Sequence, residues 1–100
     1  MSAVYAHEKF SQAVHTLVTG NGTVQSRLAD AAIHLILLQP ADLPKNLQEK
    51  FADIRHNLTK EKDVADEGKI SATTKAMTNE QGAKIAEQIL DIYIDLYRNR

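Results

Sequence analysis

The sequence predicts an all-α protein, a small antiparallel bundle of four long helices with a candidate fifth, short helix. Apolar residues recur at spacings of three and four along most of the chain, which is the period of a helix with one buried face. The four glycines and two prolines are too few for the turns of a many-stranded sheet. A chain of 100 residues suffices for one core, so we expect 1–100 to be a single helical domain.

The first helix is expected over about 2–18. Its apolar stripe consists of Ala3, Ala6, Phe10, Ala13, Val14 and Leu17. Two glycines in the segment 20–22 tolerate a left-handed backbone and should end this helix. The second helix is expected to begin after Thr23, as its N-cap, and to end before Pro40.

The second helix is predicted to be apolar on more than one side. One side carries Val24, Leu28, Ala31, Leu35 and Leu38, while Ile33, Ile36 and Leu37 lie well away from it. A helix that is apolar around most of its circumference is buried on several sides. This helix is therefore expected at the centre of the bundle or in a dimer interface that includes Ile33 and Leu37.

The third helix is expected to have Asp42 as its cap and Pro44 in its first turn, where a missing N–H costs little. Its apolar residues fall within a narrow arc and are Leu43, Leu47, Phe51, Ile54 and Leu58. The charged segment 60–69 is interpreted as a loop or a frayed helix end. The segment 70–77 is the candidate short helix.

The last helix is expected to open at Thr78, because Thr78 and Gln81 have the spacing of a capping box. Its main stripe consists of Ile85, Ile89, Ile92 and Leu96. Four further residues widen the apolar arc to about half the circumference and are candidates for an interface: Leu90, Tyr93, Ile94 and Tyr97. The two tyrosines are interpreted either as contact residues or as the edge of the core.

Composition excludes several classes of protein. The 12 basic and 13 acidic residues give no basic footprint for nucleic acid or a membrane surface. No cysteine is present, so disulfides, thiol nucleophiles and thiolate metal sites are excluded. The longest strongly apolar run, 31–38, is far shorter than the ~20 residues that span a bilayer. The chain shows no targeting signal, and we expect a cytoplasmic protein of bacterial origin.

Arg27 and His34 lie almost above one another on the second helix, with six residues between them. This spacing resembles the arginine–histidine motif of HEPN-type ribonucleases, which are all-helical and often dimeric. The resemblance covers 27–34 and implies metal-independent RNA cleavage, with His34 in proton transfer and Arg27 steadying the phosphate. Leu28 stands where that family usually has a polar residue. The alternative interpretation is a polar seam along a buried helix.

His15 lies in a segment, 13–20, that resembles histidine-phosphotransfer domains, which are helical bundles of similar size. The resemblance implies that an exposed His15 accepts a phosphoryl group. That family has a lysine three residues after the histidine and a glycine four after, where this chain has Val18 and Thr19. The alternative interpretation is a histidine that faces solvent.

Metal sites are not expected. Asp30 and His34 have a spacing that can hold a metal, but a site needs further ligands, from among His7, His15 and His56. The segment 63–74 has part of the spacing of a calcium loop but lacks ligands at its third and twelfth positions. The segment 20–23 is interpreted as a connector rather than an anion-binding loop, and no cofactor is expected.

These features favour a small regulatory or interaction protein over an enzyme. We expect it to act without catalysis, by binding through an apolar helix face, as a homodimer and with another protein as a further partner. The ribonuclease with Arg27 and His34 is the first alternative, and the phosphotransfer module with His15 is the second.

Overall fold

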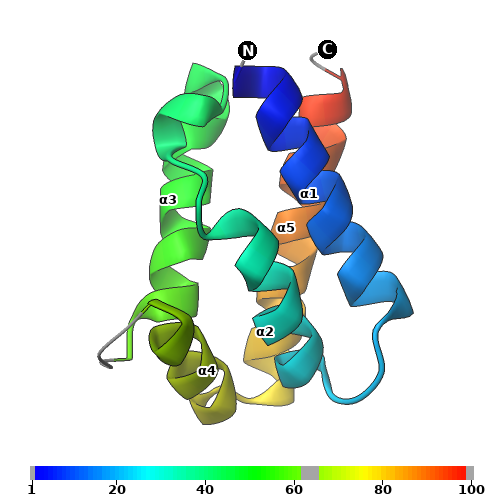
Figure 1. Ribbon diagram of the computed structural model, residues 1–100, viewed down its shortest axis with the longest axis vertical. Coiled ribbons are helices and arrows are strands. Elements are labelled where there is room, and N and C mark those ends of the chain that lie inside the picture. Colours follow the sequence, from blue (N-terminus) through cyan, green and yellow to red (C-terminus); the bar gives the residue numbers. More distant parts are fainter. Residues whose placement is uncertain (1, 62–65, 99–100) are drawn as a thin grey trace.

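The computed structural model describes residues 2–61 and 66–98, and the side chains of residues 4–61 and 68–98. Within these ranges the chain forms five α-helices and one short 3-10 helix, η1 (Figure 1). Their bounds are α1 Ser2–Thr19, α2 Val24–Leu35, η1 Pro40–Asp42, α3 Lys45–Thr59, α4 Asp66–Ala76 and α5 Asn79–Arg98. The predicted all-α class is confirmed.

The long helices form an antiparallel bundle. In Figure 1, α1 and α3 run downward and α2 and α5 run upward, so that both chain ends lie at the top. The shorter α4 lies beside the lower end of α3, and α2 stands in front of α5. Helix α1 packs along both α2 and α5, and α4 packs on α2 and α3. These contacts make α5 and α1 neighbours with a shared outer surface.

One hydrophobic core joins all five helices. The stripes predicted for the last two long helices are buried in full, including Leu43, which precedes α3. Phe10 of α1 and Phe51 of α3 meet at the centre edge to face, with ring centroids 5.8 Å apart. Such an aromatic pair adds to the free energy gained from burying the two rings.

Two predicted helix starts are confirmed by their hydrogen bonds. The Thr23 hydroxyl accepts from the backbone N–H of Ser26 at 3.1 Å. At α5 the Thr78 N–H donates to the Gln81 side chain at 2.8 Å, and the Gln81 N–H donates to the Thr78 hydroxyl at 3.1 Å. Gly22, with a φ of 94°, supplies the left-handed residue in the connection before α2.

The second helix is predicted to end before Pro40, and α2 ends several residues before that proline. Its last residue is Leu35, and Gln39 is already extended, as a residue before proline prefers to be. The unwound segment is held by Arg55 of α3, which donates to the backbone oxygen of Leu38 at 3.0 Å. Leu38 still reaches the core because the chain turns there instead of continuing the helix.

The predicted role of Asp42 as the cap of the third helix is wrong. Asp42 is the last residue of η1, and its carboxylate accepts from the backbone N–H of Gln39 at 2.8 Å. Pro44 is the N-cap of α3, one position outside the helix rather than in its first turn. Two nearby prolines thus produce a separate 3-10 turn, which a single capping rule does not anticipate.

The short helix is longer than predicted. Helix α4 begins at Asp66, so the loop interpretation of 60–69 is wrong for 66–69, and Gly68 lies in the helix. The buried Thr73 hydroxyl accepts from the backbone N–H of Glu61 at 3.0 Å and links α4 to the end of α3. This tertiary bond stabilises a helix whose own apolar pattern is weak.

Within 2–61 and 66–98 no helix has an apolar stretch long enough to cross a bilayer.

Candidate functional site

The seam between α1 and α5 holds an aromatic cluster. The His7 ring stacks on Tyr93, with centroids 5.3 Å apart and planes at 25°, and it lies 6.2 Å from the Tyr97 ring. Among the described residues, the buried His7 Nε2 atom has no hydrogen-bond partner. The stacking on Tyr93 places His7 in aromatic surroundings at this seam.

An uncharged row of side chains runs along each helix on this side. The row on α1 has helical spacing and consists of Val4, His7, Ser11, Val14 and Val18. The row on α5 consists of Ala83, Ala86, Leu90, Tyr93, Ile94 and Tyr97. Neither set contains Lys, Arg, Asp or Glu, but the exposed Glu87 lies one turn from both Ala83 and Leu90 and borders the row on α5. We call the two rows together the α1/α5 face.

The α1/α5 face has a packed floor and exposed rims. Val14, Ala86 and Tyr93 are partly buried against the core and form the floor. The most exposed members are Val4 at 73%, Val18 at 75% and Tyr97 at 62%, and Leu90 and Ile94 are also exposed. Clustered exposure of large apolar side chains, unlike scattered exposure, marks an interaction surface.

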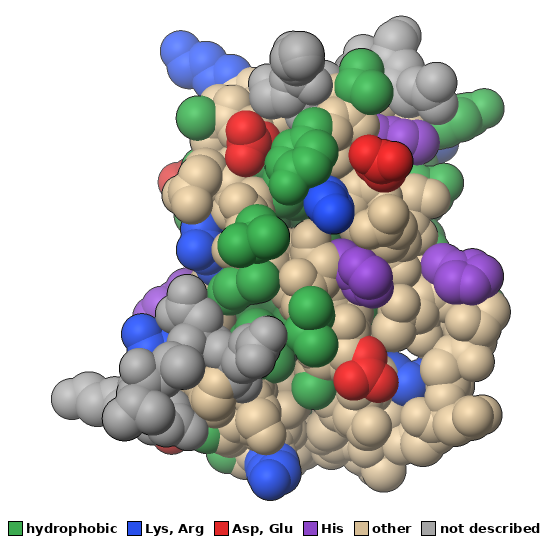
Figure 2. Space-filling view, in the orientation of Figure 1, with side chains coloured by type: hydrophobic (Ala, Val, Ile, Leu, Met, Phe, Trp, Pro, Cys, Tyr) green, Lys and Arg blue, Asp and Glu red, His purple; other side chains and the backbone are tan. Residues whose placement is uncertain are grey.

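The predicted interface residues therefore divide between two places. Leu90, Tyr93, Ile94 and Tyr97 belong to the α1/α5 face, and Tyr93 is half-buried at its floor. Ile33 and Leu37 are 50% and 72% exposed, on α2 and on the turn after it. Figure 2 shows hydrophobic side chains gathered over the front of the molecule, where these segments run.

The side of α2 that carries Ile33 does not join the α1/α5 face. Ile36, just after α2, lines a small cavity with Ile54 of α3 and Ile70 of α4, so the exposed side that carries Ile33 borders those two helices. His34, about 100° further round the helix, faces α1 instead. Ile33 and Leu37 are thus a separate apolar surface.

Arg27 and His34 both contact α1. Arg27 Nη1 donates to the backbone oxygen of Leu17 at 2.9 Å, while its buried Nε atom has no hydrogen-bond partner in the described part of the chain. The His34 Nε2 atom lies 3.4 Å from the Thr16 hydroxyl. Arg27 therefore satisfies a carbonyl at the end of α1, where helices leave such groups unpaired. These contacts favour the polar-seam interpretation of the pair.

His15 is exposed near the end of α1, and His56 is exposed on α3. The backbone oxygen of His15 accepts from the Thr19 hydroxyl at 2.8 Å, which belongs to the local capping of the helix. Among the residues that the structure describes, no three His, Asp or Glu side chains gather closely enough to hold a metal ion. Asp63 lies outside the described residues, and 66–74 are helical and do not form a calcium loop.

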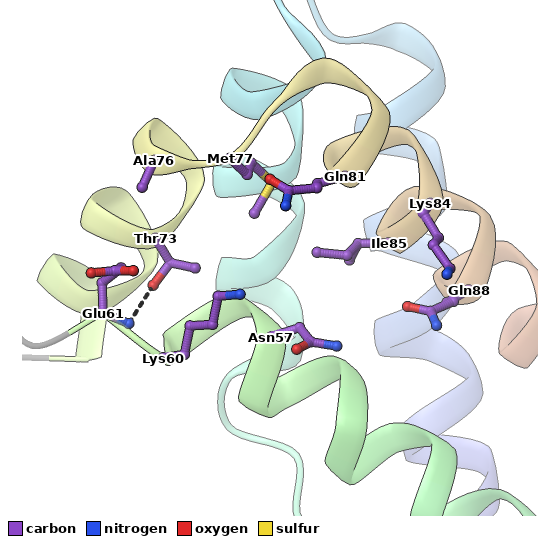
Figure 3. A pocket seen from close by; sticks show the side chains of 10 residues that line it. All are labelled: Asn57, Lys60, Glu61, Thr73, Ala76, Met77, Gln81, Lys84, Ile85 and Gln88. Carbon is purple, nitrogen blue, oxygen red and sulfur yellow. Dashed lines mark hydrogen bonds between the residues drawn. The ribbon is translucent and has the colours of Figure 1, made fainter.

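A pocket of about 340 Å³, lined by both polar and apolar side chains, opens where the end of α3, α4 and the first turns of α5 meet (Figure 3). Asn57 reaches it from α3 and Lys60 from the position just after α3, and Lys84, Ile85 and Gln88 reach it from α5. Sequence reasoning missed this pocket. The polar residues come from separate helices with no shared motif, so only the packing of α4 reveals that they converge.

Comparison of the chain with protein families, with curated proteins and with solved structures found no match.

Proposed function

We propose that the protein acts by binding and that its α1/α5 face takes a second copy of the chain. The observation that carries this proposal is the face itself: two adjacent helices whose outer rows hold five exposed large apolar side chains and no Lys, Arg, Asp or Glu, with Glu87 at their border. Monomeric proteins rarely leave contiguous apolar surfaces of this kind uncovered. A two-fold dimer buries the same patch on both copies.

The sizes of the side chains on α5 fit an antiparallel two-fold contact. Ala83 and Tyr97 each lie seven residues from Leu90, and Ala86 and Ile94 each lie four residues from it. With the two-fold axis at Leu90, each alanine of one copy lies opposite a large side chain of the other. Alternating small and large residues let facing helices interlock.

The charges at the ends of α5 fit the same arrangement. Glu80 lies in the first turn of α5 and Arg98 in its last turn, and both are exposed. Antiparallel pairing brings Glu80 of one copy to within about two residues, or ~3 Å along the axis, of Arg98 of the other. Opposite charges at the rim of an apolar contact fix its register.

The row on α1 gives an independent check of the axis. His7 of α1 lies at the same height along the bundle as Tyr93 and Tyr97 of α5. Because the two helices are antiparallel, the height of Leu90 on α5 corresponds to a position about five residues after His7 on α1, near Ser11. Val4 and Val18 each lie seven residues from Ser11. The axis that pairs the α5 residues therefore also pairs Val4 with Val18 of the second copy.

The size of the face indicates a dimer of moderate affinity. Two neighbouring helices ~30 Å long and ~10 Å wide present a footprint on the order of 600 Å² per copy. Stable interfaces usually bury ~800 Å² per partner, so a dissociation constant in the micromolar range is expected.

Cysteine cross-linking tests the proposed axis directly, because the chain has no cysteine of its own. In Leu90→Cys the two new thiols face each other across the axis, and mild oxidation should give a covalent dimer of twice 11.1 kDa. Ser11→Cys should cross-link in the same way on α1. The readout is a non-reducing gel followed over time.

Asp91→Cys is the matched control, since Asp91 is exposed and lies about 100° round the helix from Leu90. Its thiol should cross-link at least about tenfold more slowly, because the proposed dimer contact holds the two introduced thiols of the two copies apart. Equal rates for Leu90→Cys and Asp91→Cys, or slow rates for both axis positions, would contradict the proposal.

A further inference from the structure

The pocket between α3, α4 and α5 has the shape and the lining of a small-molecule site. Its volume of about 340 Å³ is within the range of such sites, which is ~300–1,000 Å³. Figure 3 shows the side chains of Lys60, Asn57, Ile85 and Gln88 directed into one space from two helices. Asn57 and Gln88 are half-buried, so their amides are held at the wall of the pocket.

The charges of the pocket favour an anion. Lys60 and Lys84 stand on opposite walls, and within the described residues neither ammonium group pairs with a carboxylate. Among the described residues that line the pocket, Glu61 is the one acid, and Figure 3 shows its carboxylate beside Thr73, on the far side from Lys84. The first turn of α5, which carries Gln81, adds the positive end of a helix dipole.

The floor of the pocket favours an anion with an apolar body. Ile85, Met77 and Ala76 contribute hydrocarbon and thioether surface to the lining. A bare inorganic anion would leave this surface uncovered, whereas an organic anion would bury it. Amides beside such a floor are the polar groups that orient an organic ligand.

We infer that this pocket binds a small organic carboxylate, with its acid group between Lys60 and Lys84 and its hydrocarbon part on Ile85 and Met77. The inference does not rest on the proposed dimer. Lys84 and Gln88 lie on the flank of α5 away from Leu90 and Tyr97, so the pocket stays open when the α1/α5 face is covered.

The test is a titration of the whole ¹⁵N-labelled chain, followed by backbone amide shifts, with hexanoate as the probe. We expect saturable shifts at residues that line the pocket. Hexanamide, which has the same chain without the charge, and inorganic phosphate, which has the charge without the chain, should each bind at least about tenfold more weakly. Equal affinity for hexanoate and phosphate would overturn the organic class of the ligand.

The double variant Lys60→Met, Lys84→Met should weaken hexanoate binding at least about tenfold, because both side chains are exposed enough to be replaced without loss of the fold. Lys45→Met is the control, since Lys45 is an exposed lysine at the other end of α3. Absence of saturable shifts in the wild-type chain would overturn the inference. Unchanged affinity in the double variant would overturn it as well.

Discussion

Leu90→Lys is expected to convert the proposed dimer into a monomer. Leu90 lies at the proposed two-fold axis, so the substitution buries two ammonium groups against each other in an apolar contact. The dissociation constant of the dimer should rise at least about 100-fold, which is ~2.7 kcal/mol. Sedimentation velocity at several protein concentrations measures this change.

The fold should survive this substitution, because Leu90 is 42% exposed and lies outside the buried core. Leu37→Lys is the matched control: it makes the same chemical change on the separate surface beside α2. Helical circular dichroism of the two variants should match that of the wild type. If Leu37→Lys dissociates the dimer and Leu90→Lys does not, the interface lies on the separate surface with Ile33 and Leu37. The proposed two-fold axis at Leu90 is then wrong.

Phe51→Ala should cost about 3–5 kcal/mol of unfolding free energy, the range observed when a buried aromatic ring is truncated. The Phe51 ring is fully buried and meets Phe10 edge to face, so its loss leaves a cavity between α1 and α3. Domains of this size are stable by only ~5–15 kcal/mol, and the variant should be near the limit of folding. Urea denaturation at a fixed protein concentration provides the measurement.

If the alanine variant is unfolded, Phe51→Leu still allows the loss of unfolding free energy at this position to be measured. Leucine fills most of the site, and we expect a loss of about 1–2 kcal/mol with an unchanged slope against urea. A loss below about 1 kcal/mol for Phe51→Ala would show that this ring does not join the helices as the structure describes.

The core was predictable from sequence because burial repeats with the helical period. The stripe from Leu47 to Leu58 and the stripe from Ile85 to Leu96 are both buried as predicted. The capping box at Thr78 was also predictable, since its two bonds join residues three positions apart. Such local rules act within one element and do not depend on what the element packs against.

The helix ends near the two prolines were not predictable in the same way. The segment after α2 is held by Arg55, seventeen residues away from the Leu38 oxygen that it binds. The bond between Glu61 and Thr73, which links the end of α3 to α4, likewise joins residues twelve positions apart. Local pattern carries no information about such partners, so capping rules placed Asp42 on the wrong helix.

Only the α5 part of the α1/α5 face could be predicted from the sequence. The broad apolar arc of α5 indicated Leu90, Tyr93, Ile94 and Tyr97, but the row on α1 did not stand out. Val4 and Val18 lie off the apolar stripe predicted for the first helix, and they form part of a surface only because α1 packs antiparallel to α5. Burial is a property of one helix, whereas a surface shared by two helices requires knowledge of their pairing.

The measurement that tests the central proposal most directly is the mass of the unmodified chain by light scattering, at micromolar and near-millimolar concentrations. A contact between copies through the α1/α5 face predicts a mass that rises from near 11.1 kDa to near twice that value as concentration increases. A mass of 11.1 kDa at both concentrations would contradict the proposal that a second copy covers this face.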